Sequence, residues 1–168
     1  MAGHSRKPRQ SGSLTLEFAL LFGGILAPAT FAFVFTAQLL WVWHSVNDFT
    51  RQGAGYAATH CWESSAGNVI SWMQANTPLM PNQSQFQNGP VQIAVSYFAE
   101  DPATGTLTAF NCDGDCSTGC IPDVVTVSVT GFQYQPFFML PPITMPNFQA
   151  TVPMESCGCD PEQGICVP

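Results

Sequence analysis

The stretch SGSLTLEFALLFGGILAPATFAFVFTAQLLWVW, residues 11–43, decides the fold that this chain is predicted to adopt. From Phe18 to Trp43 it runs for 26 residues without one formal charge. As an α-helix that run is about 39 Å long, which exceeds the ~30 Å hydrocarbon thickness of a bilayer. We therefore predict a transmembrane helix over residues 13–43, with a kink site at Pro28, because proline cannot donate a backbone hydrogen bond.

The distribution of charge predicts how this helix is oriented. Three of the four basic residues lie in the first nine positions, whereas the chain after Gly12 has eleven acidic residues and one basic residue, Arg51. Basic flanks stay on the cytoplasmic side, so residues 1–12 are predicted to be a cytoplasmic leader and the rest to be exported. Trp41 and Trp43 fit the aromatic belt at the far interface. Nucleic acid is a disfavoured partner of the exported part, because little there neutralises phosphates.

Beyond the membrane the sequence predicts an α+β arrangement: a helix packed on a small antiparallel sheet. Apolar and small residues at three- and four-residue spacing predict a membrane-proximal helix over residues 44–76. Within residues 90–156 the period changes to alternation, which predicts a β domain. Its four strands are expected around Val91–Tyr97, 104–110, Val125–Thr130 and Phe148–Met154. Pro153 places the last strand at an edge of the sheet, since proline cannot donate to a neighbouring strand.

The cysteines are disulfide candidates, because an exported chain leaves the reducing cytosol. The seven are Cys61, Cys112, Cys116, Cys120, Cys157, Cys159 and Cys166, the last three within a tail over residues 157–168. An odd number means that at least one is free or bonded to another chain. Their spacing does not form the two matched pairs of a usual zinc site, so no metal is predicted, and the pairing stays open.

Glu17 is the residue that a plain membrane anchor does not explain. A charge inside a membrane span is costly, although less so near an interface, where Glu17 could also simply reach the headgroups. The segment G-S-L-T-L-E-F, from Gly12 to Phe18, resembles the class III prepilin cleavage motif. The resemblance implies a cut between Gly12 and Ser13 by prepilin peptidase, a membrane aspartyl protease. The new α-ammonium of Ser13 would lie one helical turn from Glu17, which could neutralise it on its own chain or on a neighbour.

Longer segments resemble the TadE-like pseudopilins of tight-adherence (Flp) pili. These are the apolar helix, the following FTRQGAGYAA (residues 49–58), and a late Val-rich and aromatic-Pro stretch over residues 125–156. The resemblance implies a minor pilin-like subunit of the bacterial inner membrane that acts in assembly of a pilus or secretion system. Its implied partners are prepilin peptidase, other pilin-like subunits and an inner-membrane assembly platform. In such a subunit Glu17 and Phe18 would fix the register between neighbouring helices.

No catalytic constellation is apparent, so we predict neither an enzyme nor a cofactor. The histidines His4, His44 and His60 form no recognisable triad, and no Gly-rich phosphate loop is present. The rival hypothesis is an uncleaved, membrane-anchored periplasmic enzyme or binding module. A secretory signal peptide would need a cut near Ala27-Pro28-Ala29, but the apolar run continues well past that site. The aromatic stretch over residues 132–142 is interpreted as core or as a docking patch.

Overall fold

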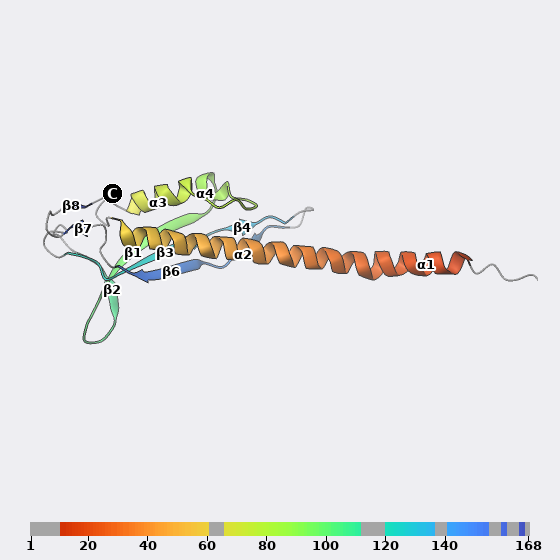
Figure 1. Cartoon of the computed structure of the whole chain (residues 1–168), viewed down its shortest axis with the longest axis horizontal. Coiled ribbons are helices and arrows are strands. Elements are labelled where there is room, and N and C mark those ends of the chain that lie inside the picture. The colour runs from red at the N-terminus through yellow and green to blue at the C-terminus, as the bar shows by residue number, and fades with distance from the viewer. Residues whose placement is uncertain are drawn as a thin grey trace, which may run out of the picture. The chain divides into compact units, whose positions relative to one another are not determined.

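The computed structural model describes residues 11–60, 66–111, 120–136, 141–154, 159–160 and 165–166. The chain divides into two compact units, Met1–Leu40 and Trp41–Pro168. The first unit holds the start of a long helix, and the second holds the rest of that helix with the sheet (Figure 1). The boundary falls close to the predicted end of the membrane segment at residue 43.

The first unit is helical throughout its described part. It contains α1 (Ser11–Leu21), the π-helical turn η1 (Phe22–Leu26) and the first part of α2 (Ala27–Thr59). By length and composition, Gly12–Thr59 is one helix able to cross a membrane, and none of its most apolar window is buried. The coarse prediction, a single apolar N-terminal helix of membrane-spanning length, is therefore confirmed.

The irregularity expected at Pro28 takes the form of a π-helical turn just before it. In η1 the backbone N–H of Ala27 donates to the carbonyl of Phe22, five residues back. In a regular α-helix the carbonyl of Gly24 would face Pro28, which has no N–H to offer and whose ring crowds that turn. The wider turn is one of the known ways in which a helix accommodates such a residue.

The second unit contains two long helical segments where one was predicted. Helix α2 ends at Thr59 and α3 covers Ala66–Ala75, so the single helix expected over residues 44–76 is divided. At the end of α2 the Thr59 hydroxyl donates to the carbonyls of Gly55 and Tyr56, at 3.3 and 3.1 Å. A short helix, α4 (Gln85–Asn88), follows.

The sheet has four antiparallel strands in the order β2-β1-β3-β6. Their bounds are β1 Gln92–Glu100, β2 Leu107–Ala109, β3 Val124–Thr130 and β6 Phe148–Pro153. The register pairs Val95 with Val127 and Val127 with Ala150. The predicted strands and the edge position of β6 are thus confirmed. Two strand pairs of two residues each were not predicted, because such short strands show no alternation. They are β4 (Gln133–Tyr134) with β5 (Ile143–Thr144), and β7 (Cys159–Asp160) with β8 (Ile165–Cys166).

The core lies on one face of the sheet, beneath the helices. The side chains of Val125, Val127 and Val129 are fully buried, whereas alternate residues of β1 and β6 are exposed. The part of α2 in this unit buries one stripe, namely Val42, Val46, Phe49, Thr50, Gly53, Ala54, Ala57 and Ala58. Phe86 joins the layers, because its ring contacts Phe49 at 5.0 Å and Phe132 at 5.5 Å between centroids. The start of the aromatic stretch, Phe132 and Tyr134, is therefore core, while residues 137–140 lie outside the described part.

Candidate functional site

The predicted processing and register residues lie together on the first turns of α1. The hydroxyl of Ser13 donates to Oε1 of Glu17 at 3.3 Å, and both side chains are exposed. Phe18 is 68% exposed, and its ring stacks on that of Phe22 with centroids 5.9 Å apart. At Gly12 no neighbouring atom lies within 4 Å of the position that a β-carbon would take. Position 12 therefore has room for a larger side chain within the described structure.

In the described part of α1, the neighbours of Glu17 along the helix are apolar. The neighbours Leu16, Leu20 and Leu21 are 60–66% exposed and apolar. In the described range 11–50 there is no lysine or arginine, and the structure gives Glu17 a hydroxyl rather than a cation as partner. A hydroxyl–carboxylate bond is weaker than a bond between two charged groups. In a low-dielectric environment this carboxylate therefore favours an added cation within hydrogen-bond reach.

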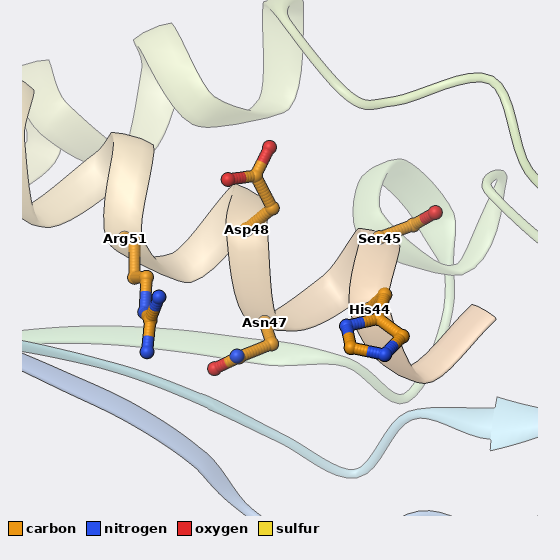
Figure 2. Close-up of a pocket in the computed structure, with 5 residues that line it drawn as sticks. All are labelled: His44, Ser45, Asn47, Asp48 and Arg51. Atoms are coloured by element: carbon orange, nitrogen blue, oxygen red, sulfur yellow. The ribbon is translucent and has the colours of Figure 1, made fainter. Parts of the chain in front are cut away.

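A second candidate is a shallow hollow of about 400 Å³ on α2, lined by His44, Ser45, Asn47, Asp48 and Arg51. Figure 2 shows His44, Asn47 and Arg51 pointing to one side of the helix and Asp48 to the other. On the other side of the helix, Oδ2 of Asp48 accepts a 2.7 Å hydrogen bond from Nε2 of Gln52. Arg51 is therefore not neutralised by the acid closest to it in sequence.

The hollow does not gather its polar groups around one point. His44 and Arg51 are seven residues apart, which is about 10 Å along a helix axis. No nucleophile–base pair is present among its lining residues, and no three metal-ligating side chains converge anywhere in the described part of the chain. The lining residues can contact an anion or a polar surface. Sequence reasoning did not select these residues, because polar side chains at helical spacing are typical of a solvated face.

The structure describes only part of the cysteine set. Cys120 is disulfide-bonded. Cys159 and Cys166 lie opposite each other in the register of β7 and β8. The other four predicted candidates, Cys61, Cys112, Cys116 and Cys157, lie outside the described residues. The bonding partner of Cys120 is therefore left open.

Two further titratable groups have shifted pKa values for structural reasons. The backbone N–H of Ala103 donates to Oδ1 of Asp101 at 2.8 Å, and this bond, helped by the Thr104 hydroxyl, lowers the pKa of Asp101. Burial of Tyr134 raises the pKa of its phenol. Asp101 caps a turn, and Tyr134 lies in the core.

Comparisons of the chain with protein-family models, with curated proteins and with solved structures found no match.

Proposed function

We propose that the chain is a minor pilin-like subunit that prepilin peptidase cuts between Gly12 and Ser13. Residues 13–43 hold it in the bacterial inner membrane, and the second unit lies in the periplasm, where it takes part in assembly of a tight-adherence pilus or secretion system. The function is association with other subunits and with an assembly platform, and not catalysis. The observation that carries the proposal is the Ser13–Glu17 hydrogen bond at the head of a bare apolar helix.

The proposed mechanism follows from that spacing. Cleavage would create an α-ammonium on Ser13, a residue whose hydroxyl is already 3.3 Å from the Glu17 carboxylate. An α-amine is largely protonated at neutral pH, so the pair would be neutral overall. The same carboxylate could instead pair with the amine of a neighbouring helix, which would set the stagger between subunits. Either pairing removes an otherwise costly isolated charge from the membrane.

The exposed apolar side chains of the N-terminal helix support side-by-side association of this helix with the helices of other subunits. Its apolar side chains, such as Phe31 and Phe33, are 64% and 77% exposed, so they offer contact surface in more than one direction. In lipid, such helices associate through van der Waals packing and polar contacts rather than through the hydrophobic effect. Glu17 is the polar group that would select one stagger among the many that apolar packing alone allows.

The test is the N-terminal residue of the full chain purified from membranes that contain a prepilin peptidase, determined by mass spectrometry. The proposal expects a start at Ser13, and Gly12→Val should retain the leader. Gly23→Val is the matched control, because the surroundings of Gly12 and Gly23 are equally open. A start at Met1 or Ala2 in the unaltered chain would exclude processing, and a start at Thr30 would indicate a secreted domain instead.

The rival function is an uncleaved, membrane-anchored binding module. The hollow formed by His44, Asn47 and Arg51 is the one observation that favours it. This rival predicts an intact leader together with a melting temperature of the second unit that rises when an anion is added. A chain that begins at Ser13 and melts independently of added anions would exclude it.

A further inference from the structure

Different segments of the chain meet at each of the two ends of the four-stranded sheet. At one end β1 begins, β3 finishes and β6 begins, because Gln92 pairs with Thr130 and Val129 pairs with Phe148. At the other end β1 finishes beside the start of β3, where Phe98 pairs with Val124. The antiparallel register therefore separates the second unit into two ends whose side chains can be compared.

The end where β3 begins is acidic. Glu100, Asp101 and Asp123 are all exposed there. The backbone N–H of Glu100 donates to Oδ2 of Asp123 at 2.8 Å, so the two chain segments are adjacent. Asp101 follows directly and caps the turn that leads towards β2. We name this the acidic end.

At the opposite end of the sheet, the segments that the strands and α4 bring together contain no charged residue. The ring of Trp43 contacts that of Phe148 at 5.0 Å, which brings the start of the unit's helix to this end. The side chain of Gln85 holds the backbone of Gln133 with two hydrogen bonds, of 2.6 and 3.0 Å. No Asp, Glu, Lys or Arg occurs between residues 64 and 99 or between residues 124 and 154.

This uncharged end also displays large apolar side chains. In the described part of the second unit, five such side chains are exposed: Leu79 86%, Trp41 52%, Leu107 47%, Trp43 40% and Ile143 37%. All but Leu107 lie on the segments that reach the uncharged end. The connection between α3 and α4, which carries Leu79, reaches this end, because Oδ1 of Asn82 accepts a 3.1 Å hydrogen bond from the backbone N–H of Gln135, the residue after β4. We name Trp41, Trp43, Leu79 and Ile143 the apolar end.

The apolar end lies directly after the apolar helix in the chain, which indicates the surface nearest to it. Trp41 directly follows Leu40, the last residue of the unit whose helix is long and apolar enough to cross a membrane. If the helix leaves the bilayer near Trp41, the apolar end begins at the headgroup level. Tryptophan is favoured at that level, and exposed leucine and isoleucine gain by leaving water. An acidic surface is repelled by anionic lipids, which accords with its position at the opposite end.

We infer that the apolar end docks on the surface of the bilayer that the helix crosses, with lipid as its occupant. The inference rests on the membrane anchoring in the proposed function, but on neither its processing step nor its role in a pilus. Docking at Leu79 and Ile143 adds contacts far from Trp41 in sequence. The second unit would then contact the membrane at several residues, in addition to its covalent connection to the helix.

The test places an environment-sensitive fluorescent amino acid at position 79 of the full chain. The labelled chain is purified from membranes that contain a prepilin peptidase and is reconstituted in phosphatidylethanolamine–phosphatidylglycerol vesicles. Leu107 is the matched control, since it is also an exposed leucine but lies on β2, which pairs with the acidic-end part of β1. With spin-labelled lipids in the vesicles, we expect loss of emission at position 79 and none at position 107. Circular dichroism of each labelled chain verifies that the second unit is folded.

Equal quenching at both positions, or none at position 79, would overturn the inference. A blue shift at position 79 without quenching by lipid would also overturn it, because that result indicates a second protein copy as the occupant. The N-terminus of the same sample separates this inference from the proposed function. Lipid quenching with an uncut leader removes the pilin-like processing alone, whereas a chain that starts at Ser13 without lipid quenching removes the docking alone.

Discussion

The two parts of helix α2 have similar apolar residues and opposite surroundings. Before Leu40 its side chains are bare, with Phe33 77% exposed, whereas after Trp41 Val42 and Val46 are completely buried. The difference lies in the pattern. The first part is apolar in all directions, and the second has a stripe at three- and four-residue spacing with polar residues between. An all-round apolar helix is matched to lipid, and a striped one is matched to a protein core on one side and water on the other.

The largest expected difference between the two units comes from removing one aromatic ring from each of them. Phe86→Ala should lower the free energy of unfolding of the second unit by about 3–5 kcal/mol, because the ring fills space between Phe49 and Phe132. Phe33→Ala should leave that stability unchanged, since Phe33 is exposed in the first unit. Thermal unfolding in detergent, followed by near-ultraviolet circular dichroism, measures both. Equal effects of the two changes would contradict the comparison.

A glycine pair gives a smaller and sharper comparison. A β-carbon at Gly53 would collide with the side chain of Met73, whereas one at Gly23 meets nothing within 4 Å. Gly53→Val should therefore destabilise the second unit by about 1–3 kcal/mol, the usual cost of overfilling a packed core. Gly23→Val introduces the same β-branched residue into helix and should have no such effect. The same melting experiment decides, and an unchanged melt for Gly53→Val would mean that Met73 moves aside at no cost.

Replacing Glu17 should affect association and leave folding intact. Glu17→Ala and Glu17→Gln both remove the charge, and we expect membrane insertion and the melt of the second unit to be unchanged while assembly is lost. Ser13→Ala is the control, because it removes the hydroxyl bond and keeps the proposed α-amine. Fibre counts by electron microscopy and co-purification of subunits measure the outcome. Normal assembly by both Glu17 variants would exclude the register role.

The smallest expected effect is local and depends on pH. The pKa of Asp101 is lowered from 3.8, first by the Ala103 N–H and then by the Thr104 hydroxyl. The ionised side chain therefore supports its turn above pH 3.8, and this support is lost as the pH falls through the lower, folded pKa. A carbon-detected NMR titration should give a midpoint for Asp101 below 3.8, with the Ala103 amide shifting in parallel. In Asp101→Asn that amide should not titrate, and a midpoint of 3.8 or higher would refute the assignment.

Much of this architecture could be predicted because it depends on long patterns. The bare helix follows from 26 uncharged residues, and β3 follows from the alternation of Val125, Val127 and Val129. The end of α2 could not be predicted in the same way. Thr59 bonds back to a carbonyl four residues earlier, but Thr50 makes the same kind of bond in the middle of the helix, at 2.8 Å to Val46. The residue type alone therefore does not distinguish a helix end from a helix interior.

Part of the candidate site could likewise be predicted from a pattern in the sequence, and part could not. The Ser13–Glu17 contact was predictable, since residues four apart in a helix lie on one face. The hollow on α2 was not, because His44, Asn47 and Arg51 at helical spacing show the pattern of an ordinary solvated helix face.

The edges of the sheet bear on how copies of this chain could grow into a polymer. One edge, β2, has only three residues, and the other, β6, ends in Pro153, which has no N–H to offer an incoming strand. Both features hinder the addition of a strand from another molecule, which is the route to amyloid-like stacking. The sheet edges are therefore poor sites for joining one copy of this chain to another strand by strand.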